Sequence, residues 1–350
     1  MTQGVSPAAD CEAGLPVFPM ARAPGCPFDP PPALREAQRR GPISRMRLWD
    51  GSAPWVVTGH REQRALLSDP RLSADATRPG YPHVSPGMAE RRRDARNFIA
   101  MDDPDHLRLR RLVTAPFTVK RVEAIRPAIQ AIVDRFVEGL AAGPRPVDLV
   151  ASFALPIPSL VICELLGVPY ADHDFFQCRS ATLLRRDAAP AVVLAAQREI
   201  VGYLERLVAI KRADPADDLL SRVATDRVAA GSMTARELAN TALLLLVAGH
   251  ETTTNMIALG TLALLENPEQ LALVRGTDDP ARIAAAVEEL LRYLTITHSG
   301  RRRVALADID IGGRTIRAGE GVVVANDIGN RDPAVFADPD RLDVDRDARQ

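Results

Sequence analysis

The hydrophobic and polar positions along the chain change from an alternating pattern to a helical one and back again. Residues 43–58 alternate polar and apolar side chains around an Asp-Gly pair, which predicts two strands joined by a tight turn. Helical patterns then follow one another over residues 104–227. The period of two returns at residues 304–311 and 321–325, with a Gly-Gly turn between them. Together these patterns predict a mainly α fold with small β-sheets.

Residues 69–100 separate the first strands from the helical region and follow neither period. Prolines, glycines and a run of arginines interrupt this segment. A stretch of this length without a period is typical of a binding loop or of disorder.

The longest predicted helix begins at a capping box. Thr234 and Glu237 have the spacing at which two side chains cap each other's backbone N–H groups, and the apolar run after them is not broken until Asn267-Pro268. At ~1.5 Å per residue the helix would be ~48 Å long. Residues 243–248 are apolar on almost every side, which predicts that the middle of the helix is buried.

Residues 248–254 of this helix read Ala-Gly-His-Glu-Thr-Thr-Thr, a poor helix-forming sequence. Glycine and three β-branched residues weaken the helix, and the Thr252 hydroxyl can donate to the carbonyl of Ala248. One interpretation is a kink where another helix crosses closely. The other is a site where a small ligand approaches the backbone, and Glu251 favours it because a buried acid needs a partner or a function.

Two further pairs have helical spacing. Glu289 and Arg292 lie three residues apart among apolar neighbours, which predicts a partly buried ion pair with an architectural role. His106 and Arg110 lie one turn apart, so they project from one face and could bind a carboxylate or a phosphate. Both spacings recur elsewhere in the chain, so neither pair is diagnostic by itself.

Composition excludes several classes of protein. The chain is 46% hydrophobic and 25% charged, which excludes disorder, collagen and coiled coil. Lys plus Arg number 44 against 45 acidic residues, so no overall basic field would attract nucleic acid or an anionic membrane. The N-terminus lacks a leader pattern, and the longest unbroken apolar stretch, residues 242–248, is far too short to span a membrane. The four cysteines have no metal-ligand spacing, which fits a reducing cytoplasm.

Taken in order, these segments resemble the cytochrome P450 family, specifically its soluble bacterial monooxygenases. The motifs are D-P-D-H-x-x-x-R at 103–110 with P-F-T at 116–118, A-G-x-E-T at 248–252, E-x-x-R at 289–292 and N-R-D-P-A-V-F-A-D-P-D-R-L at 330–342. The resemblance predicts one large P450-like domain over residues 18–350, after a flexible tail of residues 1–17.

The resemblance implies a heme b cofactor, iron protoporphyrin IX, beside the long helix. The residues that match the family's heme-binding positions are His106, Arg110 and Arg303, for the propionates, with Ala248 and Gly249 on the helix. Glu289 and Arg292, joined by Arg341, match a structural triad of the family.

The resemblance also implies the reaction. Glu251 and Thr252 match the acid and the alcohol that supply protons during dioxygen activation. One oxygen atom of O2 would be inserted into an apolar small molecule of secondary metabolism. Electrons would come from an acidic ferredoxin and its NAD(P)H-dependent reductase, with Arg108 and Arg111 as the docking face. The expected compartment is the cytoplasm, with neither nucleic acid nor membrane as a partner.

One part of the family pattern is not met. The loop F-x-x-G-x-H-x-C-x-G, which carries the axial cysteine ligand, should begin shortly after Asp343, and none of Cys11, Cys26, Cys163 and Cys178 lies in that context. The C-terminal part of the domain and the metal ligand are therefore expected to be missing. Three alternatives follow: a piece of an ordinary monooxygenase, a noncatalytic truncated remnant, or a family member with nitric oxide reductase or peroxide-driven chemistry. The intact Glu251-Thr252 pair argues against the last.

Overall fold

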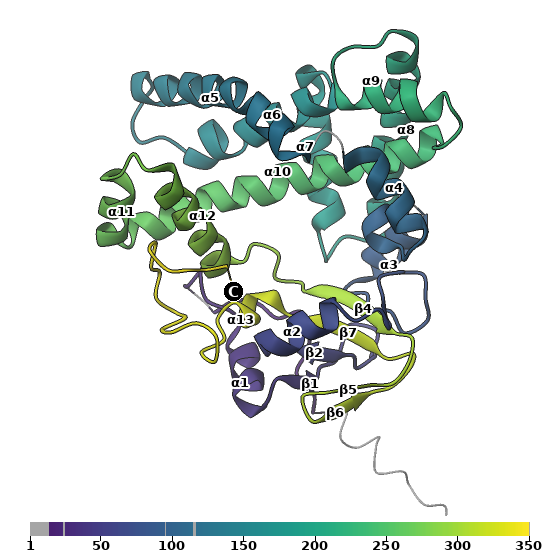
Figure 1. Ribbon diagram of the computed structural model, residues 1–350, viewed down its shortest axis with the longest axis vertical. Helices are drawn as coiled ribbons and strands as arrows, with labels where there is room; N and C mark the ends of the chain where they lie inside the picture. The colour runs from purple at the N-terminus through teal and green to yellow at the C-terminus, as the bar shows by residue number, and fades with distance from the viewer. Residues whose placement is uncertain (1–13, 24, 95, 115–116, 350) are drawn as a thin grey trace, which may run out of the picture. The chain divides into compact units, whose positions relative to one another are not determined.

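A computed structural model describes residues 14–23, 25–94, 96–114 and 117–349 (Figure 1). Cys11, Pro116 and most of the expected N-terminal tail lie outside the described residues. The contacts divide the chain into two units. We call Met1–Ser85 with Leu259–Gln350 the sheet unit, and Pro86–Ala258 the helical unit.

The sheet unit contains the strands that alternation predicted. The hairpin of residues 43–58 is confirmed, with Ile43 paired to Val57. The five-stranded sheet has the order β1 (Ile43–Arg45), β2 (Trp55–Val57), β7 (Gly321–Val324), β4 (Arg301–Ala305) and β3 (Leu72–Ser73). Only the β2–β7 pair is parallel. A separate hairpin joins β5 (Ile309–Ile311) to β6 (Arg314–Ile316) through Gly312 and Gly313, both at positive φ.

The core of the sheet unit lies around β7. All four residues of β7 are buried, as expected for a central strand that is covered on both faces. The surrounding apolar cluster is Ile43, Val57, Leu66, Leu72, Ala305, Ile309, Ile316, Val322 and Val324. The helices of this unit are α1 (Pro32–Arg40), α2 (His60–Leu67), α11 (Pro268–Arg275), α12 (Pro280–Leu294) and α13 (Asn326–Gly329).

Prolines occupy the first turn of α11 and α12, where a missing N–H costs little. The residues that precede these two helices differ as caps. Asp279 accepts a hydrogen bond from the N–H of Ala281 and caps α12. Asn267 makes no capping bond, because its side chain donates back to the carbonyl of Ala263.

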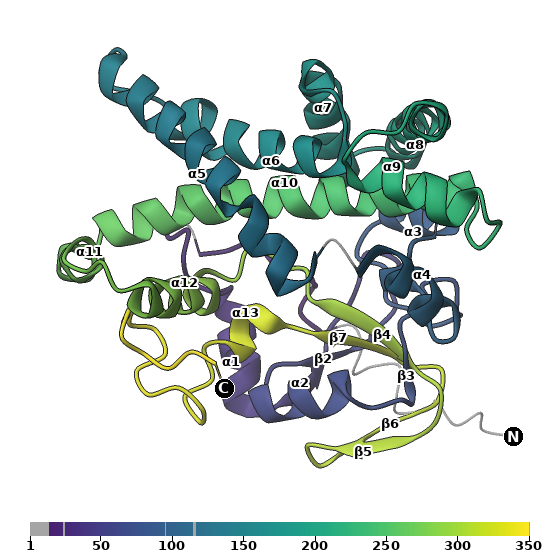
Figure 2. The ribbon, with the colours of Figure 1, turned by 45° about the horizontal axis from the view of Figure 1, so that its top comes forward.

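The helical unit packs around α8, whose apolar residues recur every three or four positions. Val193, Ile200, Leu204 and Val208 of this stripe are almost fully buried. The main helices are α3 (Pro86–Asp94), α4 (Asp105–Thr114), α5 (Val119–Ala142), α6 (Pro156–Leu166), α7 (His173–Leu184), α8 (Pro190–Ala213), α9 (Leu219–Val223) and α10 (Ala235–Leu265), the last continuing into the sheet unit. Figure 2 shows α6, α7, α8 and α9 on one side of α10.

The expectation that residues 69–100 are irregular is wrong in part, because they contain β3 and α3. Helix α3 has no amphipathic period and is held by tertiary contacts instead. Gly87 lies so close to α8 that an added Cβ would come within 2.9 Å of Val193. The Gln197 amide also donates to the carbonyl of Arg91. These contacts link residues about a hundred positions apart, which local periodicity cannot register.

Helix α10 is 31 residues long and begins at the predicted capping box. Glu237 accepts from the Thr234 N–H at 2.8 Å, and the Glu237 N–H donates to the Thr234 hydroxyl at 3.1 Å. The predicted burial on every side is wrong: Leu243 and Leu246 are buried, but Ala248 is exposed. In the described part of the chain α10 alone has the length and apolarity of a membrane span, which buried helices of globular proteins also have.

The capping box generates a stability prediction. Thr234→Ala should lower the free energy of unfolding by about 1 kcal/mol, because a first-turn N–H loses its acceptor. Urea denaturation measures this loss. Thr253→Ala removes the same atoms from an exposed position inside α10 and should not destabilise, because Ala favours helix. Equal midpoints for Thr234→Ala and the parent protein would show that the cap contributes nothing.

Candidate functional site

Side chains in the middle of α10 return hydrogen bonds to its own backbone. The Thr252 hydroxyl donates to the Ala248 carbonyl at 2.5 Å, as the sequence predicts. The Thr254 hydroxyl donates to the His250 carbonyl at 3.0 Å, and the Asn255 amide to that of Glu251. These bonds compete with the backbone ladder and favour bending, yet the segment remains helical throughout.

Residues 248–254 present two different faces. Gly249 faces α6, where an added Cβ would meet Ile162 at 3.1 Å, and the neighbouring His250 side chain is buried. Ala248 is exposed, and Thr252, one turn further along the helix, is half-buried. The close helix crossing and the accessible site, which the sequence leaves as alternatives, therefore occur on different faces of the same segment. We call the Ala248–Thr252 side the open face.

Glu251 borders the open face, with 23% of its side chain exposed. Partial burial raises the pKa of this carboxyl group above its ordinary value. A carboxyl group with a raised pKa exchanges protons closer to neutral pH than an exposed one does. An acid and an alcohol therefore lie side by side at an accessible position.

His106 and Arg110 lie one turn apart on α4, as their spacing predicts. The His106 Nδ1 lies 3.1 Å from the Asp103 carboxylate, which also accepts the Leu107 N–H. The exposed guanidinium of Arg110 makes no hydrogen bond or ion pair with any residue that the structure describes. An unpaired guanidinium beside an imidazole is a donor set suited to a carboxylate.

Helix α4 is fixed to the start of α10 by Arg108. Its guanidinium donates to the Glu237 carboxylate at 2.5 Å and lies 3.6 Å from Asp105. Arg108 therefore already has two acidic partners within the chain, which its spacing from Arg111 does not reveal, and docking through Arg108 and Arg111 stays a prediction. Arg111 is exposed and makes no ion pair within the described ranges.

Arg303 lies on β4 in the sheet unit, where its backbone faces Val322 of β7. Its guanidinium donates to the Arg302 carbonyl at 2.8 Å. The helical unit thus holds six of the residues predicted for heme binding and catalysis, and the sheet unit holds the seventh, Arg303. The six are His106, Arg110, Ala248, Gly249, Glu251 and Thr252.

The predicted Glu289–Arg292 ion pair is present and buried. Arg292 donates to both Glu289 oxygens, at 2.6 and 2.7 Å, and its side chain is 2% exposed. The same guanidinium donates to the carbonyls of Asn330 and Pro339. The pair therefore holds the irregular C-terminal segment against α12, which is the architectural role that the sequence indicates.

The third member of this cluster differs from the prediction. Arg341 contributes only its backbone carbonyl, which accepts from Arg292 at 3.3 Å, and its residue is exposed. The side chain beside Glu289 is that of Arg346, whose Nε lies 3.3 Å from the carboxylate and whose side chain is 11% exposed. Arg341 lies inside the 330–342 motif and Arg346 four residues after it, both in a segment without helix or strand, so periodicity could not show which side chain points inward.

The three described cysteines, Cys26, Cys163 and Cys178, are free thiols. Burial raises the pKa of Cys163 to about 11, so this group is a neutral thiol at pH 7. The Cys163 side chain, on α6, packs in the apolar core of the helical unit. Cys163 is thus a structural residue and not a thiolate ligand.

The chain is similar in sequence to several known proteins. A sequence-family model described as Cytochrome P450 matches residues 283–346. The chain is 53% identical over 340 residues to cytochrome P450 GfsF from Streptomyces halstedii, covering 97% of this chain and 82% of that protein. It is 46% identical over 336 residues to vitamin D3 dihydroxylase from Streptomyces griseolus, covering 95% and 81%.

Solved structures agree with these relatives. The crystal structure of GfsF superposes with a TM-score of 0.86, covering 95% of this chain and 83% of that one. Mycinamicin VIII C21 methyl hydroxylase from Micromonospora griseorubida, crystallised with mycinamicin VIII bound, gives a TM-score of 0.88 at 40% identity, covering 96% and 84%. The similarity therefore extends over nearly all of the chain and includes the two motifs of α10 and α12.

The Glu289 cluster generates a prediction that separates the two arginines. Arg292→Ala should lower the free energy of unfolding by about 3–5 kcal/mol, because it leaves Glu289 buried without its partner. Arg346→Ala should cost about 1–3 kcal/mol, since Glu289 loses a charged donor and the carbonyls of Ala337, Asp338 and Arg341 lose exposed ones. Arg341→Ala should change stability by about 0.5 kcal/mol or less. Denaturant titration of the three variants is the measurement, and an Arg341→Ala loss equal to that of Arg346→Ala would contradict the assignment.

Proposed function

The chain belongs to the cytochrome P450 family of oxidoreductases, and from this premise we propose that it acts as a heme monooxygenase on an apolar small molecule. The observation that carries the proposal is the open face of α10. It presents Thr252, with its hydroxyl fixed on Ala248, beside Glu251, with its raised pKa. Proton supply at a defined point is what reduction of dioxygen requires of the protein.

The residues of α10 and α4 fit the ring and the carboxylates of a heme, whereas none of the four cysteines lies in the axial-ligand motif. Leu244 and Leu245 are half-buried and Ala248 is exposed on one side of α10, so this side offers a small, apolar surface to a flat macrocycle. Arg110 and His106 on α4 offer a cation and an imidazole to its carboxylates, and we propose Arg303 as a further donor. When bound, heme b supplies the redox-active iron at which dioxygen is cleaved.

The chain's own residues would move the protons. The Thr252 hydroxyl donates a hydrogen bond to the Ala248 carbonyl. The lone pairs of the Thr252 oxygen therefore remain free to accept a hydrogen bond from a group at the open face. Glu251 can then pass a proton to that position and be reprotonated from solvent, since its carboxyl group is partly exposed. Gly249 keeps α6 and α10 close together, so the segment holds its position during the transfer.

Partner and substrate are further parts of the proposal. We propose an acidic ferredoxin, with its NAD(P)H-dependent reductase, as the electron donor, and the exposed charge of Arg111 supports this choice better than that of Arg108, which is paired with Glu237. An apolar substrate of secondary metabolism fits the names of the relatives. Leu184 on α7 is exposed and is a candidate substrate contact, whereas Leu183 is buried in the core. The free cysteines fit a cytoplasmic location.

Replacing Thr252 tests the proposal. In the heme-loaded enzyme, Thr252→Ala should leave substrate affinity unchanged but divert NAD(P)H electrons to hydrogen peroxide, lowering product formation about 10²-fold. Peroxide and product are measured against NAD(P)H consumed. Thr253→Ala, one residue further along α10 and exposed, is the matched control and should remain coupled. Full coupling in Thr252→Ala would favour nitric oxide reduction or peroxide-driven chemistry.

Heme binding provides an independent prediction. Arg110→Ala should weaken heme affinity about tenfold or more, because one charged donor to a carboxylate is lost. Titration of the apoprotein with heme, followed by absorbance, measures the change. Arg111→Ala removes a neighbouring exposed arginine and should have little effect. Equal affinities for the two variants would remove Arg110 from the proposed donor set.

A further inference from the structure

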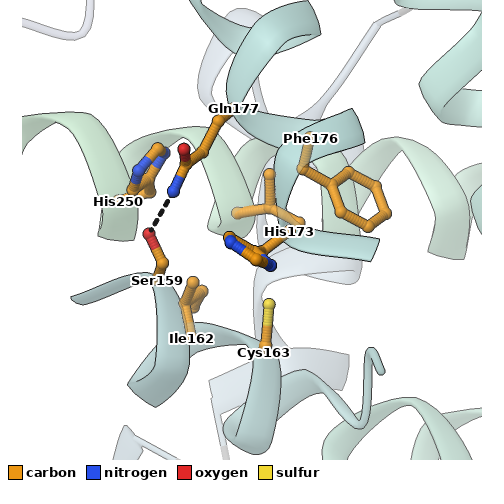
Figure 3. A pocket seen from close by; sticks show the side chains of 8 residues that line it. Ser159, Ile162, Cys163, His173, Phe176, Gln177 and His250 are labelled. Carbon is orange, nitrogen blue, oxygen red and sulfur yellow. Dashed lines mark hydrogen bonds between the residues drawn. The ribbon is translucent and has the colours of Figure 1, made fainter. Parts of the chain in front are cut away.

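A small cavity lies on the packed side of α10, away from the open face. It has a volume of about 10 Å³ and lies entirely within the helical unit, between α6, α7 and α10. Ser159, Gln177 and His250 line it together with His173 and Cys163, and the apolar lining residues are Ile162, Phe176 and Leu246 (Figure 3). This cavity is therefore separate from the residues assigned to heme and substrate.

His250 is the residue of the cavity whose hydrogen bonding is incomplete. It is 3% exposed, and its Nε2 has no hydrogen-bond partner among the described residues. Figure 3 shows the Gln177 amide and the Ser159 hydroxyl on the same side of the cavity as the His250 ring. A buried ring nitrogen without a partner is costly, so a polar ligand is expected at this point.

The neighbouring side chains are already engaged with each other. The Ser159 hydroxyl donates to the Leu155 carbonyl at 2.7 Å and accepts from the Gln177 amide nitrogen at 3.3 Å. Each group keeps further bonding capacity, a lone pair on Ser159 and an N–H and the oxygen of Gln177, yet neither makes a hydrogen bond to His250 Nε2. A water molecule can join all three, because it both donates and accepts, and the cavity volume is close to the ~10–15 Å³ that one water needs.

We propose that this cavity binds one internal water molecule, which joins His250 Nε2 to Gln177 and Ser159, and that His250 thereby positions Glu251. The His250 Nδ1 lies 3.9 Å from a Glu251 carboxylate oxygen, so the orientation of the ring limits where this carboxylate can lie. The water would fix the ring from its other side. The positioning role rests on the proposed function of Glu251, whereas the water site does not.

The protonation of the ring agrees with this arrangement. Burial lowers the pKa of His250 below its ordinary value, so the ring is neutral at pH 7. In the neutral ring one nitrogen donates and the other accepts, and a water at Nε2 can satisfy either tautomer. Glu251 therefore has a neutral neighbour, which does not compete for its proton.

Histidine NMR tests the water site without any catalytic readout. In the 350-residue chain labelled with ¹⁵N-histidine, His250 should show one neutral tautomer, and a water cross-peak should appear at its ring. Ser159→Ala should shift the His250 Nε2 resonance, because the water loses a partner. Leu246→Met, a change of similar volume in the same cavity, should not. A missing water cross-peak together with an unchanged resonance in Ser159→Ala would overturn the water site.

Turnover tests the positioning role. In the heme-loaded enzyme, His250→Leu should raise the fraction of electrons lost to peroxide several-fold while substrate affinity is kept, and His250→Gln, which keeps a polar group, should restore much of the coupling. If His250→Leu does not fold, Gln177→Met removes the same water partner from α7 and should show the same defect. Unchanged coupling in these variants would overturn the positioning role. Full coupling in Thr252→Ala would instead count against the proposed function and leave the NMR result standing.

Discussion

The middle of α10 has to be packed on one side and accessible on the other, and the remaining features of the helical unit follow from this constraint. Gly249 permits contact with Ile162 of α6, and His250 is buried toward α7. Ala248 and Thr252 leave a different side accessible. A helix with longer side chains at these positions could still pack on one side. Its side chains would, however, cover the side that has to remain accessible. The hydroxyl and amide bonds to the backbone explain how such a sequence still forms a helix.

Much of this arrangement could be predicted from sequence, where the signal is local. The capping box at Thr234, the hairpin of residues 43–58 and the Glu289–Arg292 pair all depend on spacings of a few residues, and all three are found. The fold class followed from the same periodicities, and the relatives confirm it. The back-bond of Thr252 was also predictable, because it depends only on the helix to which the residue belongs.

The contacts that the sequence did not reveal join distant parts of the chain. Helix α3 is held by α8, and Arg108 is paired with Glu237, more than a hundred residues away. Arg346 replaces Arg341 in a segment that has no period to fix which side chains point inward. The order of this segment depends on guanidinium groups that donate to backbone carbonyls. Arg331, for example, is fully buried and donates to the carbonyl of Tyr293 and to Asp340.

The contact between Gly249 and Ile162 has a consequence for how this family of sequences can vary. An alanine at 249 would place its methyl group 3.1 Å from the Ile162 Cδ1, so the Ile162 side chain would have to shift by a few tenths of an ångström. Such a movement would also change the volume available beside His250, because Ile162 lines that cavity. Substitutions at positions 249 and 162 are therefore coupled. A related chain that carries a larger residue at 249 is expected to carry a smaller one at 162.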